Sequence, residues 1–240
     1  MRNASSTERK PHPRKSIFTL QRVRRIHQDL PDGFNADIQS RLAEVRKLLS
    51  SIAGDVQGIN RWRYMRNMSC VEELIEALTF AHYLRHQNLM SYAEATEAVH
   101  HLSLPENGED GAAMDLEHPI VHLIEDDYLM GVFDLSGEMM RFATTTAALN
   151  GRMAGSSLQY DGQADEGSPQ RTIVTDMQDL GSFYEMLPQQ SGKSYQVKLQ
   201  TLRTSVLKVE KLGYGLTVRG SERPAGWMPD TNDSEPGSPV

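Results

Sequence analysis

Two pairs of acidic residues lie within otherwise apolar sequence. Glu73 and Glu76 are three residues apart in VEELIEALTF, and Asp134 and Glu138 are four residues apart in YLMGVFDLSGEMMRF. On a helix of 3.6 residues per turn, both spacings place the two carboxylates of a pair on one face. Gly131 removes side-chain bulk about one turn before Asp134. If the two helices lie side by side, all four carboxylates converge.

Converging carboxylates repel one another, and this repulsion raises their pKa values unless a cation is shared among them. Mg²⁺ suits such a group because it prefers hard oxygen ligands and commonly also binds water and substrate phosphate. The corresponding chemistry is phosphodiester hydrolysis. The alternative is that these acids form an ordinary solvated surface, in which Glu138 simply pairs with Arg141 three residues later.

A basic and aromatic segment, RWRYMR, precedes the first acidic pair. It contains three arginines that we predict to bind RNA, together with two aromatic residues: Arg61, Arg63 and Arg66, with Trp62 and Tyr64. Arginines can bind phosphates, and aromatic rings can stack on unpaired bases. The alternative is a solvated basic face with buried rings.

Composition limits the classes of function. The chain has 240 residues, 38% of them hydrophobic, and a net charge of -7, which argues against attraction of nucleic acid to the whole surface. The one cysteine, Cys70, excludes an intrachain disulfide framework and a cysteine zinc site, and suits a reducing compartment. There is no apolar run of about 18 residues to span a bilayer. We therefore expect a cytoplasmic and nuclear protein that does not bind membranes.

Apolar residues recur with helical spacing along the chain, and no segment shows the alternation of a strand. Within the longest of the early segments, Ser69 and Glu72 have the spacing of a capping box, which can start a new helix. The sequence predicts an all-α bundle of about six or seven helices. The helical segments are expected at about 17–26, 38–52, 60–89, 91–102, 120–148, 171–187 and 195–218.

We expect one helical domain, residues 16–223, between two disordered tails. The tail at 1–15 is basic and polar, and the tail at 224–240 is rich in proline. Two segments rich in glycine and polar residues, at about 104–119 and 150–170, predict mobile loops within the domain.

Three segments together resemble the translin family, in its translin-associated factor X branch: EELIEALTF, DDYLMGVFDLSGEMMRF and LRTSVLKVEKLGYGLTVRGSERP. The resemblance runs, with gaps, from about Ser16 to Pro224. It implies a translin-like helical fold and an octameric hetero-oligomer with translin. It further implies that Glu73, Glu76 and Asp134 are catalytic acids that bind Mg²⁺, for which Mn²⁺ can substitute, with Glu138 as a further metal ligand.

The leading hypothesis is therefore the catalytic subunit of a magnesium-dependent endoribonuclease. Together with translin it would cleave single-stranded RNA, in RNA processing or in the activation of RNA silencing. One alternative is a non-catalytic subunit that stabilises translin and helps to bind single-stranded RNA or DNA. Another is a pure interaction protein that only completes the shell of the oligomer. Divalent-dependent cleavage separates the first hypothesis from the non-catalytic subunit, and loss of RNA binding on removal of the arginines would argue against the pure interaction protein.

Overall fold

A computed structural model describes residues 14–26, 32–64, 68–104, 119–155 and 171–219. Within these ranges the secondary structure is helical and contains no strand, which confirms the predicted all-α fold. The helices are α1 (Arg14–Leu20), α2 (Asp32–Ile52), α3 (Ile59–Arg63), α4 (Ser69–His86), α5 (Tyr92–Ser103), α6 (Glu125–Asn150), α7 (Ile173–Met186) and α8 (Lys193–Arg219).

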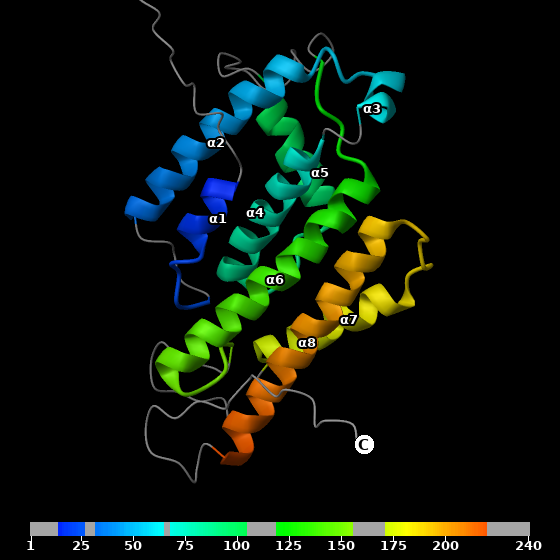
Figure 1. Ribbon diagram of the computed structural model, residues 1–240. Coiled ribbons are helices and arrows are strands. Elements are labelled where there is room, and N and C mark those ends of the chain that lie inside the picture. The colour runs from blue at the N-terminus through cyan, green and yellow to red at the C-terminus, as the bar shows by residue number, and fades with distance from the viewer. Residues whose placement is uncertain (1–13, 27–31, 65–67, 105–118, 156–170, 220–240) are drawn as a thin grey trace, which may run out of the picture.

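Helix α6 is the centre of the arrangement (Figure 1). It packs against α4 on one side and against α8 on the other, and α7 packs against α8. On the outer side of α4, α1 contacts both α4 and α2, and α2 also packs against α5. The faces of α4, α6 and α8 that meet one another therefore decide which polar side chains share a cavity.

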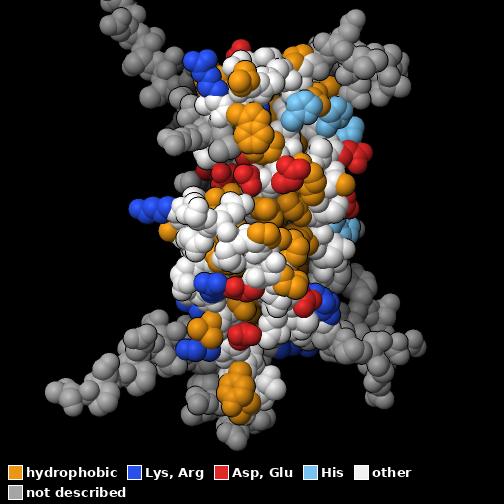
Figure 2. All heavy atoms as spheres, turned by 90° about the vertical axis from the view of Figure 1, so that its right-hand side faces the viewer, with side chains coloured by type: hydrophobic (Ala, Val, Ile, Leu, Met, Phe, Trp, Pro, Cys, Tyr) orange, Lys and Arg blue, Asp and Glu red, His pale blue; other side chains and the backbone are white. Residues whose placement is uncertain are grey.

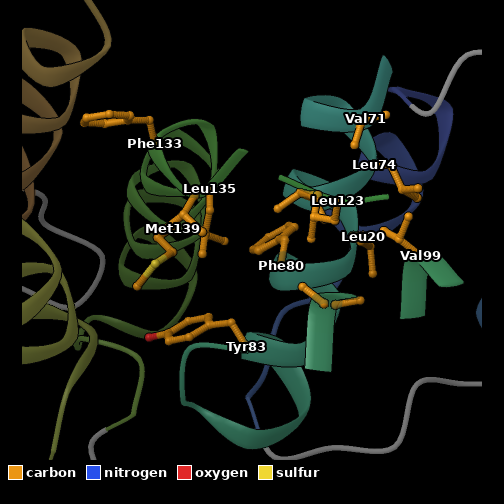
Figure 3. Close-up of a cluster of buried hydrophobic side chains, with 14 of the residues drawn as sticks. Leu20, Val71, Leu74, Phe80, Tyr83, Val99, Leu123, Phe133, Leu135 and Met139 are labelled. Atoms are coloured by element: carbon orange, nitrogen blue, oxygen red, sulfur yellow. The ribbon is translucent and has the colours of Figure 1, made fainter. Parts of the chain in front are cut away.

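The core fills the space between α4 and α6 (Figure 3). Phe80 of α4 points toward Leu135 and Met139 of α6, and all three side chains are buried. On the opposite side of α6, Phe133 stacks on Tyr184 of α7, with ring centroids 3.9 Å apart. Phe133 also makes an edge contact with Tyr195 of α8, at 5.2 Å between centroids. These aromatic contacts hold α7 and α8 against α6.

Helices α4 and α6 approach most closely at Gly131. A Cβ atom at this position would lie 2.6 Å from the Cβ of Ile75 and 2.8 Å from the carbonyl oxygen of Glu72. Real Cβ atoms do not come this close to backbone atoms, so the contact requires glycine. Since Gly131 precedes Asp134 by about one turn and Ile75 lies between the two glutamates, this contact sets the two acidic pairs side by side.

Several boundaries differ from those predicted. Helix α1 begins at Arg14, inside the predicted tail at 1–15, and ends at Leu20, so Val23 and Ile26 follow the helix. The segment predicted at 60–89 contains two helices, α3 and α4, and α4 begins at Ser69, where a new helix was predicted to start. The described residues thus contain eight helices, against about six or seven predicted. Helix α6 begins at Glu125, because residues 119–124 are non-helical and the backbone N–H of Val121 bonds to Ser103.

The capping box predicted at Ser69 does not form, because the N-cap is Met68 and no side chain caps the helix. Of the predicted loop at 150–170, the structure describes residues 150–155, and Asn150 is still the last residue of α6. The remainder of that loop, nearly all of 104–119 and the tail at 224–240 lie outside the described residues. None of the described helices combines the length and apolarity needed to cross a membrane.

Replacing Gly131 with Ala should destabilise the fold by about 1–3 kcal/mol, because the added methyl group overpacks the contact between α4 and α6. Gly137→Ala is a matched control on the same helix, since a methyl group there would meet no atom of a neighbouring element within 4 Å. The control should instead stabilise the fold by about 0.5–1 kcal/mol, because alanine favours the helix. Urea unfolding of both variants measures the difference, and equal effects would contradict the close contact.

Candidate active site

The four predicted acids line one cavity of about 420 Å³. Glu73 and Glu76 come from α4, and Asp134 and Glu138 come from α6. Ile17 and Phe18 of α1 and Gln21, directly after it, close the cavity on one side, and α8 contributes Lys198 and Thr201. The remaining lining residues belong to α6: Phe133, Gly137 and Arg141. Because α4 packs against α6, the condition under which the two acidic pairs were expected to converge is met.

Glu76 has the most perturbed carboxyl group of the cavity. Burial, together with the negative charges of Asp134, Glu138 and Glu73, raises the pKa of Glu76 to about 8, and the positive charge of Lys198 opposes this only weakly. The buried side chains of Phe80 and Tyr83 follow Glu76 on α4 and cover this side of the helix. At neutral pH without a compensating cation, Glu76 is therefore mostly protonated.

Lys198 of α8 provides a positive charge within this acidic cavity. Its Nζ donates to Oδ2 of Asp134 at 2.7 Å and to Oε2 of Glu72 at 2.8 Å. A third bond, of 3.0 Å, goes to the carbonyl oxygen of Met130. Burial disfavours the charged ammonium, but the bonds to Asp134 and Glu72 outweigh this effect and raise the pKa of Lys198 above its ordinary value.

Glu138 is the most buried of the four acids, with 7% of its surface exposed. Its Oε2 accepts a hydrogen bond of 2.9 Å from Nε2 of Gln21. The same oxygen lies 3.5 Å from Nε of Arg141, whose side chain is 61% exposed. The pairing of Glu138 with Arg141 that the spacing allowed therefore occurs, but it occurs on the wall of the cavity rather than on a solvated face.

The donor set suits a hard divalent cation, because four carboxylates face a common cavity and at least one of them is destabilised in its charged form. Their present arrangement is less compact than a metal site requires. Within the described ranges, no three His, Cys, Asp or Glu side chains are positioned to hold a metal ion. One oxygen of Asp134 is already taken by the ammonium group of Lys198.

The predicted RNA-binding arginines are not equivalent. Arg61 is 4% exposed, and its guanidinium group pairs with Asp127 of α6 and donates to the carbonyl oxygen of His122 at 3.3 Å. This correction has a simple cause: Arg61 anchors the short helix α3 to the bundle and is not presented to RNA. Arg63 is exposed, whereas Arg66 lies outside the described residues.

The rings beside these arginines are exposed, contrary to the alternative of buried rings. Trp62 is 62% exposed and Tyr64 is 41% exposed. Exposed rings of this size carry apolar surface into solvent, which is typical of a binding surface. The exposed side chains that a nucleic acid could contact here are therefore Arg63 and Trp62 of α3 and Tyr64, the residue that follows the helix.

Lys198 and Glu72 are the site residues that sequence analysis missed. Lys198 was not among the predicted site residues, and Glu72 was considered only as part of a helix cap. Their ion pair joins residues 126 positions apart, so no local pattern predicts it. The apolar neighbours of Lys198 do not indicate which way it faces, because Val197 is 57% exposed whereas Leu199 is buried.

Comparisons with known proteins agree with the segments that carried the resemblance. A family model described as "Translin family" matches residues 4–220. Translin-associated protein X of Rattus norvegicus is 27% identical over 228 residues, which cover 90% of this chain and 71% of the rat protein. The mouse protein of the same name is 26% identical with the same coverage. A Schizosaccharomyces pombe homologue of that protein is 23% identical over 183 residues, covering 75% of this chain and 64% of its own length.

The raised pKa of Glu76 predicts a pH-dependent stability in the presence of a chelator. Because the pKa is about 8 in the folded chain against an ordinary 4.5, the folded state binds the proton more tightly. The resulting stabilisation is complete below about pH 4.5 and is lost as the pH rises through about 8. Between pH 5 and 8.5, the free energy of unfolding of the wild-type chain should fall by about 1–3 kcal/mol relative to that of Glu76→Gln, allowing for solvent screening.

Urea unfolding across this pH range measures the effect. Glu44→Gln is the control, because Glu44 lies on the exposed side of α2 and its replacement should follow the wild-type profile. Parallel pH profiles for wild type and Glu76→Gln would show that Glu76 does not retain its proton in the folded chain.

Proposed function

Because the chain belongs to the translin family, we propose that it is the catalytic subunit of a magnesium-dependent endoribonuclease that acts with translin on single-stranded RNA. The observation that carries this proposal is the common cavity lined by Glu73, Glu76, Asp134 and Glu138. The similarity to proteins named translin-associated protein X supports translin as the partner.

In this proposal the four carboxylates hold Mg²⁺, with Mn²⁺ as a substitute. The bound ion would polarise the scissile phosphate and lower the pKa of the attacking water. Since Glu76 keeps its proton while the cavity lacks a cation, binding of the ion favours the ionised form of Glu76, and the site exchanges a proton for a cation. Arg141, on the exposed edge of the cavity, provides a positive charge that attracts the phosphate backbone.

The edge of the cavity also suits an unpaired nucleotide. Phe18 of α1 is 63% exposed and lines the same cavity as the acids. An exposed ring can stack on a base of any sequence, which favours single strands because their bases are not already stacked in a duplex. Phosphate and base would thus meet Arg141 and Phe18 at the entrance, with the carboxylates beneath them.

Exposed apolar side chains on α7 and α8 support the proposed assembly with translin. Figure 2 shows hydrophobic side chains spread over the face that lies on the right in Figure 1, where these helices pack together. Large exposed patches of this kind mark protein interfaces. Six residues of the two helices are exposed to at least 42%: Phe183, Met186, Val197, Leu207, Tyr214 and Val218.

A non-catalytic partner subunit is the second candidate, and one observation favours it. Lys198 neutralises part of the acidic cavity and holds Asp134, so the cavity can remain stable without a metal ion. In this case the chain would stabilise translin and help to bind single-stranded RNA or DNA through α3, without cleaving either one.

Cleavage by an Asp134→Asn complex separates the two candidates. The change preserves size and shape but removes the charge needed to hold a cation, so Mg²⁺-dependent cleavage of labelled single-stranded RNA should fall by about 100-fold or more, while assembly with translin survives. Asp126→Asn is the control, because Asp126 is exposed on the first turn of the same helix. A complex with Asp134→Asn that cleaves as fast as wild type would leave only the non-catalytic role.

Replacing Arg63 with Ala should weaken RNA binding and flatten its salt dependence, since one phosphate contact on a single strand contributes about 0.7 to the slope of log K against log salt. Trp62→Ala should weaken binding by about 1–3 kcal/mol with little change in the slope, because stacking is not electrostatic. Lys47→Ala on α2 is the control for a lost surface charge. Fluorescence anisotropy with labelled RNA at several salt concentrations measures each effect, and an unchanged slope for Arg63→Ala would exclude a phosphate contact.

A further inference from the structure

Lys198 has no remaining donor for another ligand. An ammonium group has three N–H donors, and those of Lys198 go to Asp134, Glu72 and the carbonyl oxygen of Met130. The bonds join α8 to both α4 and α6, and the side chain is only 19% exposed. These three hydrogen bonds already account for a lysine at this position, so a direct contact with substrate is not needed to explain it.

The position of the ammonium group has a clear electrostatic consequence. It shares a cavity with four carboxylates, whose mutual repulsion opposes the close contact between α4 and α6. A positive charge within hydrogen-bond distance of Asp134 offsets that repulsion in place of a bound metal ion. The same charge repels an entering divalent cation, and it occupies the Asp134 oxygen Oδ2.

We propose that Lys198 is an internal counter-cation that competes with the divalent metal ion for Asp134. Without metal, Lys198 holds Asp134 and keeps the acids from driving the helices apart. When the metal ion binds, it displaces the ammonium group from Asp134, and Glu72 retains Lys198 at the edge of the site. The inference rests on the proposed metal site, and the bond from Nζ of Lys198 to Oδ2 of Asp134 carries it.

The experiment measures Mn²⁺ binding and does not depend on cleavage. Mn²⁺ alone is titrated into the full chain, purified with translin, and free Mn²⁺ is measured by electron paramagnetic resonance. Lys198→Met and Lys198→Gln remove the charge, so both variants should bind Mn²⁺ about tenfold more tightly than wild type. Lys198→Arg keeps the charge and should stay within about threefold of wild type. Lys208→Met on the exposed side of α8 is the control for removal of a lysine charge.

Thermal unfolding gives a second readout. Without metal, Lys198→Met should be less stable than Lys198→Arg, and saturating Mn²⁺ should raise its Tm by about 2–4 °C more than it raises the Tm of wild type. A structural lysine with no electrostatic role would give the same metal-induced shift in both proteins. If Lys198→Met fails to fold even when Mn²⁺ is present, replacement of the ammonium group by the metal ion is excluded.

The outcomes distinguish this inference from the proposed function. Wild-type binding of Mn²⁺ with equal or weaker binding by Lys198→Met would overturn the competition while leaving the metal site intact. Absence of Mn²⁺ binding in wild type and in every Lys198 variant would overturn both, because the metal site itself would then be missing.

Discussion

The close contact between α4 and α6 at Gly131 is the constraint on which the site depends. Helices normally pack 8–10 Å apart, and the absence of a side chain at Gly131 lets Ile75 and the carbonyl oxygen of Glu72 approach the α6 backbone directly. The contact brings Glu73 and Glu76 beside Asp134 and Glu138, although the two pairs are about sixty positions apart in the chain. Phe80, one turn after Glu76 on α4, points toward Leu135 of α6, and the burial of both side chains stabilises this approach.

The contact has an electrostatic cost, and the remaining features of the site reduce it. Carboxylates held together by packing cannot move apart to relieve repulsion, so Glu76 retains a proton and its pKa rises to about 8. Lys198 provides a positive charge from α8, which the stacking of Phe133 on Tyr184 and its edge contact with Tyr195 hold against α6. Gln21 donates a hydrogen bond to Glu138, and Arg141 forms an ion pair with it. Apolar packing thus sets the positions of the charges, and in the proposed metal site these charges would determine how readily a cation enters.

The sequence predicted the features that depend on local spacing. Apolar periodicity located the last helix and both helices that carry the acids, and the spacing of the acids predicted that the two members of each pair share a helix face. That the two pairs share one cavity depends on the packing of α4 against α6, which the sequence analysis could state only as a condition. Contacts between distant segments could not be predicted in this way. Arg61 and Arg63 have similar local sequence surroundings, since each lies beside an aromatic residue in RWRYMR. Only the ion pair with Asp127, 66 residues later in the chain, shows that Arg61 is buried. Lys198 likewise depends on the rotation of α8 about its own axis, which no local pattern encodes.

The central claim is that packing at the contact between α4 and α6 creates a site for a divalent cation among Glu73, Glu76, Asp134 and Glu138. Anomalous diffraction from crystals of the complex with translin, soaked with Mn²⁺, tests this claim most directly. We predict an anomalous peak inside this cavity, coordinated by carboxylate oxygens from both helices, with Nζ of Lys198 displaced from Asp134. A cavity without a peak at a saturating Mn²⁺ concentration, with Lys198 still bound to Asp134, would contradict the account.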